Sequence, residues 1–232
     1  AYFFGSQLQE ILDVPVGIIH TSWGGSFVEA WISKEVLSEY QEINLDNAKL
    51  ANSHRVKTAL FNAMIAPLIP FSIKGALWYQ GEGNRGNPDA YKELFPAMVK
   101  DWRTRWDIGE FPFYYVQIAP FYYRNDSAAF NTVGNSAFIR ETQLECLNLI
   151  PNSGMAVTMD VGDKYSIHPP QKKVVADRLL FNALNKTYGF SNVDFSGPVY
   201  KNFEEKDGGM LLSFDYAETG LYSMNGLSGF EI

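Results

Sequence analysis

Segments typical of buried strands alternate with segments of helical periodicity along residues 1–190, and this alternation restricts the possible folds more than any other feature of the chain. A strand–helix–strand order produces parallel strands joined by crossover helices. We therefore expect an α/β fold, a doubly wound parallel sheet with flanking helices. The expected strands are VPVGIIH (14–20), IKGALWYQ (73–80), FPFYYVQIA (111–119) and GMAVTMD (154–160).

The segments between these strands carry helix signals. Residues 87–106 begin with Asn87 as a candidate N-cap and Pro88 at the first helical position. Further helices are expected over 25–40, 54–70, 136–150 and 169–189, with 54–70 ending at prolines. The opening stretch AYFFGSQLQEILDV reads like the middle of a helix and lacks secretion-signal features, so we expect a fragment or a processed product.

The character of the sequence changes after about residue 191. The stretches VDFSGPVYKNF and GGMLLSFDYAE are short strand-like runs broken by Gly, Asn and Asp. We expect residues 191–232 to be the start of a β-rich accessory module. Residues 1–190 would then form the main domain, with its N-terminal part missing.

Charge and cysteine content exclude several classes of function. The net charge is −7 and the isoelectric point is near 5.0, which argues against nucleic acid or an anionic membrane as the main partner. No apolar run reaches the length needed to cross a bilayer. The single cysteine, Cys146, cannot form an intrachain disulfide and is expected to be a buried structural thiol.

Ligands bind parallel sheets at the carboxyl ends of the strands, so the loops after the strands are the candidate site. After 14–20 comes TSWGG, in which Gly24 and Gly25 precede an expected helix. Backbone N–H groups at such a turn can hold an oxyanion. The alternative is a plain tight turn.

The loop after 73–80 reads WYQGEGN and places Gln80, Glu82 and Asn84 around two glycines. Amide side chains can donate hydrogen bonds to an oxyanion, and Glu82 could orient neighbours or bind sugar hydroxyls. The alternative is a polar turn that caps itself.

The loop after 154–160 reads DVGDKYSIHPP and contains His168, with Asp160 and Asp163 upstream. A catalytic base histidine needs an acceptor on its far ring nitrogen. A lone histidine is more often structural or on the surface, but His168 shares its expected sheet edge with the other two loops.

The other histidines offer less. His20 ends an expected strand and is expected in the core or behind the site, and His54 starts an expected helix and reads as a surface residue. Their wide spacing matches no metal-ligand pattern, so no metal is expected. No glycine-rich nucleotide motif is present, and no cofactor is expected.

Together these stretches resemble the sialate O-acetylesterase family of the SGNH-hydrolase superfamily. The resemblance is carried by VPVGIIHTSWGGSFVEAW, LFNAMIAPLIPFSIKGALWYQGEGN and DVGDKYSIHPPQK, and it covers nearly the whole chain. The motifs WYQGE-x-N and IHP-x-x-K are quite specific in combination. The resemblance implies an SGNH, flavodoxin-like sheet and a serine esterase that removes O-acetyl groups from sugars.

The resemblance also implies roles for individual residues. Gly24 or Gly25 would donate a backbone N–H to the oxyanion hole, and Gln80, Glu82 and Asn84 would supply side-chain donors and support. His168 would be the base that takes the serine proton and returns it to the leaving sugar hydroxyl.

Two departures from the family pattern concern the triad. The chain has no Gly-Gln-Ser-Asn motif, and in the family that nucleophile lies upstream of a stretch like AYFFGSQLQE. Ser6 sits inside an expected helix, so an upstream segment or a separate chain is expected to carry the nucleophile. The family often places an aspartate two or three residues before the base, where this chain has Tyr165 and Ser166, so Asp163 becomes the candidate acid.

Substrate alternatives stay open at this stage. The leading hypothesis is an esterase for acetylated sialic acid or a related glycan, and the nearest rival acts on acetyl xylan or another plant polysaccharide. A non-catalytic carbohydrate-binding chain is the rival of a different class. Arg124, in APFYYRND, could meet a sialic acid carboxylate, although a solvated loop cation is the plainer reading. The resemblance suggests a periplasmic or secreted protein.

Overall fold

A three-stranded parallel sheet lies at the centre of the protein, whose computed structural model describes residues 1–46, 53–123, 136–223 and 226. The strand order is β1-β2-β3, and both ladders are parallel. The strands are β1 (Ala76–Trp78), β2 (Phe113–Val116) and β3 (Ser153–Ala156). The expected α/β fold with a parallel sheet and flanking helices is confirmed, and these three strands are shorter than their apolar runs.

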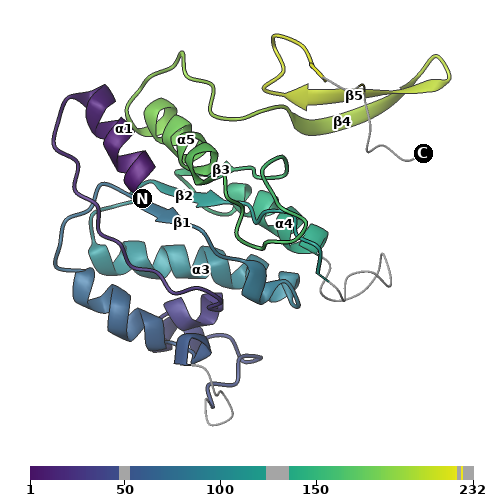
Figure 1. Cartoon of the computed structure of the whole chain (residues 1–232). Helices are drawn as coiled ribbons and strands as arrows, with labels where there is room; N and C mark the ends of the chain where they lie inside the picture. The colour runs from purple at the N-terminus through teal and green to yellow at the C-terminus, as the bar shows by residue number, and fades with distance from the viewer. Residues whose placement is uncertain (47–52, 124–135, 224–225, 227–232) are drawn as a thin grey trace.

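Helices cover both faces of the sheet (Figure 1). On one face lie α1 (Tyr2–Leu12) and α5 (Lys172–Asn182), and on the other lie α3 (Pro88–Trp106) and α4 (Ser136–Glu145). Residues of β2 alternate between the two layers, since Phe113 and Tyr115 join the α3 side whereas Tyr114 and Val116 join the α1–α5 side. Each layer therefore has its own hydrophobic core.

The long helix α3 follows its sequence signals closely. The Asn87 side chain accepts a hydrogen bond from the Ala90 N–H at 3.2 Å, and Pro88 is the first helical residue. Near its end, the buried Arg103 guanidinium donates to the carbonyl of Phe111 at 2.7 Å and to that of Pro151 at 2.9 Å. These bonds tie the last turns of α3 to the segments that lead into β2 and β3.

Two expected helices are broken into short turns. The 25–40 segment stops being helical at Ser33, whose hydroxyl accepts from the Val36 N–H and starts a new one-turn helix. The 54–70 segment breaks at 56–58, where Thr58 has φ +66°, and it ends in a short turn that contains Pro67. The short elements of the chain are η1 (Val28–Trp31), α2 (Lys34–Leu37), η2 (Ser53–Arg55), η3 (Phe61–Ile65), η4 (Ala66–Leu68), η5 (Glu82–Asn84), η7 (Cys146–Asn148) and η8 (Ala183–Thr187).

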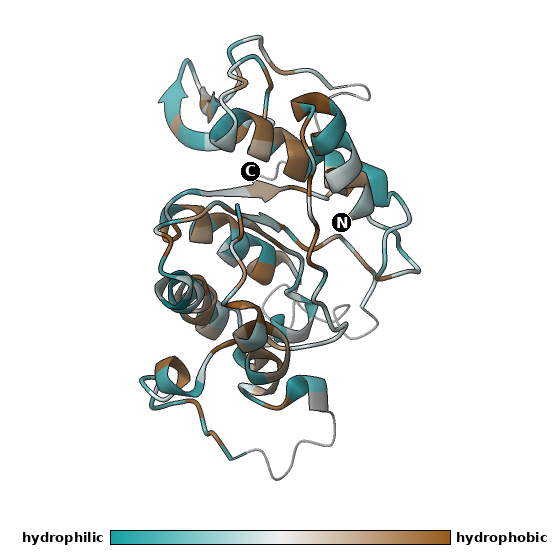
Figure 2. Cartoon of the chain, turned by 90° about the vertical axis from the view of Figure 1, so that its left-hand side faces the viewer, coloured by the Kyte–Doolittle hydropathy of each residue, from teal (hydrophilic) through white to brown (hydrophobic). Residues whose placement is uncertain are grey.

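The expectation of a strand over 14–20 is wrong. This segment is extended but belongs to neither sheet, and Val14, Ile18 and Ile19 are exposed. It leaves α1 above the sheet and descends to the helical layer below (Figure 1), as an apolar coil on the side that faces the viewer in Figure 2. β-branched residues form a strand only where a partner strand supplies backbone hydrogen bonds, and none among the described residues does so here.

An antiparallel ribbon follows the main body. It consists of β4 (Val199–Lys206) and β5 (Gly209–Asp215), and it projects from the helices and the parallel sheet (Figure 1). The expected short strands after residue 191 are confirmed by this pair. Almost all of its side chains are exposed or half-buried. Within the part of the chain that the structure describes, no helix is long and apolar enough to span a membrane.

Candidate active site

The glycine turn at 21–25 and the loop after β1 form one packed unit. Gly83 makes the closest approach, because a Cβ at this position would lie 2.7 Å from the Phe27 ring and 2.7 Å from the Ser26 carbonyl oxygen. Only glycine fits between these neighbours without displacing them. The two loops that the sequence pairs at one sheet edge therefore lie in contact.

Two buried amides hold these loops together. Asn84 Oδ1 accepts from the Val28 N–H at 2.9 Å and from Gln80 Nε2 at 2.7 Å, while Asn84 Nδ2 donates to Glu29 at 2.9 Å. Gln80 Nε2 also donates to the Ser26 carbonyl at 2.9 Å. In this arrangement the amide N–H groups of Gln80 and Asn84 are used inside the protein.

Gln143, on α4, extends the same network to the sheet. Its side chain accepts from the Ile118 N–H at 2.9 Å and donates to the Gln80 carbonyl at 3.1 Å. Gln80 Oε1 is buried with no hydrogen-bond partner among the described residues. This oxygen is therefore an acceptor of the amide network that has no donor among the described residues.

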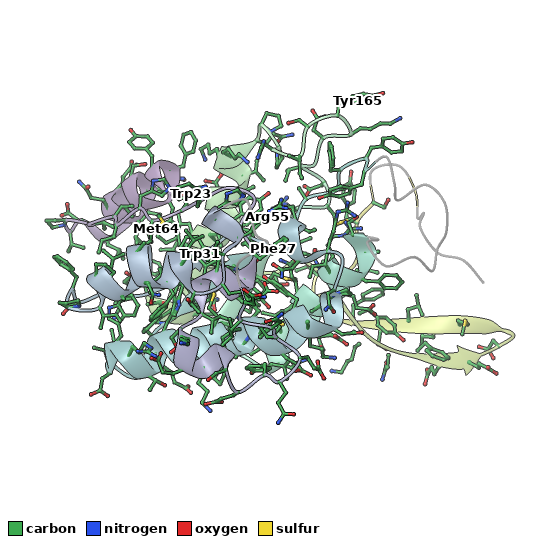
Figure 3. All side chains as sticks on the ribbon, turned by 90° about the horizontal axis from the view of Figure 1, so that it is seen from below. Trp23, Phe27, Trp31, Arg55, Met64 and Tyr165 are labelled. Atoms are coloured by element: carbon green, nitrogen blue, oxygen red, sulfur yellow. The ribbon has the colours of Figure 1, made fainter. Side chains whose placement is uncertain are left out.

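The Gly24–Gly25 turn is exposed, as an oxyanion site requires. Gly25 has φ +71°, in the left-handed region that favours glycine, and no atom lies within 4 Å of a Cβ built on Gly24. Arg55 Nε donates to the Gly25 carbonyl at 3.2 Å, and its guanidinium lies 4.9 Å from the centre of the Phe27 ring. Figure 3 shows Trp23, Phe27 and Arg55 in this cluster, with Tyr165 at the periphery.

The loop after β3 reaches across to the loop after β1. The Lys172 ammonium lies 5.5 Å from the centre of the Tyr79 ring. Burial raises the pKa of the Glu82 carboxyl, and the positive charges of His168 and Lys172 partly oppose that rise. The Lys172–Tyr79 contact joins the segment after β3 to the loop after β1, and Gly83 of that loop packs against Ser26 and Phe27, so the three sequence-predicted loops adjoin one another.

The two aspartates upstream of His168 are engaged elsewhere. Asp160 forms a bidentate ion pair with Arg178, both N–O distances being 2.6 Å, and this bond lowers the pKa of the Asp160 carboxyl. Asp163 Oδ1 accepts from the backbone N–H groups of Tyr165 and Ser166 at 2.7 and 3.0 Å. Among the described residues, neither aspartate bonds to the exposed His168 ring, so the role of Asp163 stays a prediction.

The remaining candidates are placed as follows. Ser6 is exposed on α1, where its hydroxyl bonds to the Phe3 carbonyl of the same helix. His20 is exposed, which corrects the expectation of a core position, and its Nε2 lies 2.8 Å from the Ser22 hydroxyl. His54 is half-buried against Trp23. Arg124 lies outside the described residues.

Taken together, the site combines an imidazole, a desolvated carboxyl and an exposed turn in which the Gly24 and Gly25 N–H groups have no hydrogen-bond acceptor among the described residues. Such groups serve acyl transfer, in which a base moves a proton and N–H groups stabilise an oxyanion. No group of three His, Cys, Asp or Glu residues that could bind a metal occurs among the described residues.

Reasoning from sequence assigns no role to Tyr79, although it lies within WYQGE-x-N, or to Arg55, which lies outside the candidate loops. Lys172 is the last residue of IHP-x-x-K, but the motif by itself does not indicate what this side chain contacts.

Comparison with known protein families shows to which family this chain belongs. A family model described as carbohydrate esterase, sialic acid-specific acetylesterase matches residues 1–168. The chain belongs to the sialic acid-specific acetylesterase family. The matched region contains all three loops of the candidate site and ends at His168.

Relatives and a solved structure agree with this acetylesterase family. The sialate O-acetylesterase of Mus musculus is 30% identical over 100% of this chain, and that of Homo sapiens is 35% identical over 88% of it. The crystal structure of a carbohydrate acetylesterase from Xanthomonas citri has a TM-score of 0.79 and 35% identity over 93% of this chain. The chain spans about half the length of these proteins, covering 50%, 42% and 46% of them.

Proposed function

We propose that this chain forms part of a carbohydrate esterase that hydrolyses O-acetyl esters of sialic acid or a related acetylated glycan. The proposal rests on one observation above all: in a member of this family, His168, Glu82 and the Gly24–Gly25 turn belong to three loops that meet at one edge of the sheet. His168 is the general base, and the N–H groups of the turn receive the oxyanion.

The nucleophile is a serine on a segment outside these 232 residues. The free edge of β1 supports this part of the proposal. Within the part of the chain that the structure describes, β1 pairs with β2 alone, and Leu77 is 39% exposed although its neighbour in the ladder, Tyr114, is buried. Parallel strands are normally covered on both faces. A further strand beside β1 would cover Leu77 and bring a serine to the carboxyl edge.

The reaction follows from these groups. The serine hydroxyl attacks the acetyl carbonyl carbon while His168 takes the hydroxyl proton, and the carbonyl oxygen becomes an oxyanion held by the turn. The C–O bond to the sugar then breaks, and His168 returns the proton to the sugar oxygen. Water, deprotonated by His168, attacks the acetyl-serine, and acetate leaves as the serine regains its proton.

A fluorophosphonate probe tests this reading, because it reacts with activated serines. The full-length protein is labelled and the modified peptide is mapped by mass spectrometry. We expect labelling on a peptide outside the 232 residues, and loss of labelling in a His168→Asn variant. An absence of labelling in the folded protein favours a non-catalytic carbohydrate-binding chain.

A second candidate nucleophile lies inside the chain. The exposed Ser22 hydroxyl is 2.8 Å from His20 Nε2 and two residues from Gly24. Labelling of Ser22 would move the active site to this pair and would contradict the role of His168. Hydrolysis rates on acetylated sialic acid and on acetyl xylan then separate the anionic from the neutral substrate class.

A further inference from the structure

An exposed aromatic and cationic cluster borders the Gly24–Gly25 turn, and none of its side chains has a part in the proposed catalytic roles. We call Trp23, His54 and Arg55 the turn rim. Trp23 is 49% exposed, and its indole stacks on the His54 imidazole with ring centres 6.2 Å apart and planes 13° apart. His54 Nε2 lies 3.6 Å from the Cβ position of Gly25, so the rim contacts the turn directly.

The terminal nitrogens of Arg105 and Arg178 form ion pairs, whereas those of Arg55 form none with a described residue. Arg178 is paired with Asp160, and the Arg105 guanidinium bonds to Asp101 and Glu35. Arg55 is held by its Nε bond to the Gly25 carbonyl and by the Phe27 ring, and no ion pair of Arg55 is recorded within the described ranges. Its two terminal nitrogens thus keep donors available while the side chain is already positioned.

We propose that the turn rim is a binding subsite for an anionic sugar, in which the Trp23 indole packs against the sugar ring and the Arg55 guanidinium binds its carboxylate. The inference rests on the proposed esterase function and narrows its substrate class to sugar acids such as sialic acid. Planar guanidinium groups bind carboxylates through two parallel hydrogen bonds. Aromatic side chains commonly line small-molecule sites and bury apolar ligand surface.

Charge and position both favour an acidic ligand here. The chain carries a net charge of −7, so an anionic sugar needs a local cation to bind. The carboxylate of Glu29, the nearest acid along the chain to the turn, is held by the Asn84 amide. Because Arg55 is bonded to the turn, a sugar held by it would place its ester beside the oxyanion donors.

The test uses two ligands that differ at the carboxyl group alone: the methyl glycoside of N-acetylneuraminic acid, which is an anion, and its methyl ester, which is neutral and carries one more methyl group. Binding to this chain is followed by NMR through its five tryptophan indole N–H signals. We expect the acid to bind more tightly than the ester. Arg55→Gln should weaken acid binding about tenfold and ester binding by less than about twofold.

Further variants separate the two contacts. Trp23→Leu should weaken both ligands equally, because they share the sugar ring. Arg55→Lys keeps the positive charge but not the planar guanidinium that forms two parallel hydrogen bonds. Its affinity for the acid should therefore lie between those of the wild type and Arg55→Gln. Lys100→Gln, which removes an exposed charge on α3, is the control and should change neither affinity. Added salt should reduce the preference for the acid.

Three results would overturn the subsite: equal weakening of acid and ester in Arg55→Gln, no preference of the wild type for the acid, or no binding of either ligand. An equal loss would mean that Arg55 acts only by holding the turn. These measurements need no nucleophile. If serine labelling succeeds while the acid is not preferred, the subsite fails and the esterase stands, whereas acid binding without labelling leaves the subsite standing alone.

Discussion

At the scale of single residues, the buried amides of Gln80 and Asn84 form hydrogen bonds that hold two loops of the candidate site together. Their N–H groups bind the Ser26 carbonyl and Glu29, and the Asn84 oxygen receives the Val28 N–H. A network of this kind stabilises only when its members are satisfied. The shape of the Gly24–Gly25 turn therefore depends on residues that lie beneath it.

Asn84→Ala should lower the free energy of unfolding by about 2–3 kcal/mol, because it leaves the buried Val28 N–H without its acceptor and removes one of the two acceptors of the Gln80 amide. Urea unfolding measures the change. Asn87→Ala, which removes the exposed N-cap of α3, is the matched control and should cost about 1 kcal/mol. Equal losses in the two variants would argue against a buried network.

Glu82→Gln should make the protein more stable near neutral pH. Burial raises the pKa of Glu82 above its ordinary value of 4.5 in the folded state, so ionisation costs the fold free energy as pH rises through that raised pKa. Below 4.5 the carboxyl is protonated in both states, and the variant should have no such advantage.

Urea unfolding across the acidic range checks this prediction about Glu82. The stability difference between variant and wild type should grow with pH above 4.5 and level off past the folded pKa. A constant difference at every pH would show that the Glu82 environment does not disfavour its charge. Glu10→Gln, on the exposed surface of α1, serves as the comparison.

The sequence placed the site residues at one sheet edge, but not their orientation. Polar residues after β1 and β3 must come together because parallel strands end on the same side. Nothing in WYQGEGN indicates that Gln80 and Asn84 turn inward, since that depends on the distant Ser26, Val28 and Glu29. The Asp160–Arg178 pair was likewise unpredictable from spacing alone.

At the scale of elements, prediction succeeded where signals are local. Helix α3 begins at the expected cap, and β1, β2 and β3 each lie within or at the edge of an expected apolar run. It failed for 14–20, whose strand propensity needs a neighbour, and for 54–70, which breaks at Thr58 and ends in a turn that contains Pro67.

Arg103→Lys should destabilise the joint between α3 and the sheet by about 2–3 kcal/mol. The Arg103 guanidinium donates to the carbonyls of Phe111 and Pro151 at the same time. The ammonium of a lysine cannot reproduce both hydrogen bonds. Thermal and urea unfolding report the loss. Arg105→Lys, at a partly exposed ion pair, should cost less than about 1 kcal/mol, and a reversed order would contradict the role given to Arg103.

At the scale of the whole molecule, the β4–β5 ribbon and the main body should unfold independently. The ribbon is joined to the body near Phe195, which accepts a bond from Asn182 and lies under the Lys186 ammonium. An isolated two-stranded ribbon is at most marginally stable. The proposed boundary between 1–190 and 191–232 falls just before this junction.

Limited proteolysis should cut first in the ribbon or in the connection at 196–198, and leave a resistant fragment that contains α5. A chain ending at Ser196 should keep a melting temperature within about 2 °C of the complete chain, because few core residues are lost. Early cleavage inside α3 or a large fall in melting temperature would show that the ribbon supports the body.

The unpaired edge of β1 also affects how the protein behaves in solution. Open strand edges with apolar neighbours accept a strand from any chain that presents one, including another copy of the same protein. Leu77 on this strand is exposed. Self-association of the isolated chain should therefore increase with its concentration, and we expect a strand bound at that edge, such as the one proposed to carry the nucleophile, to suppress it.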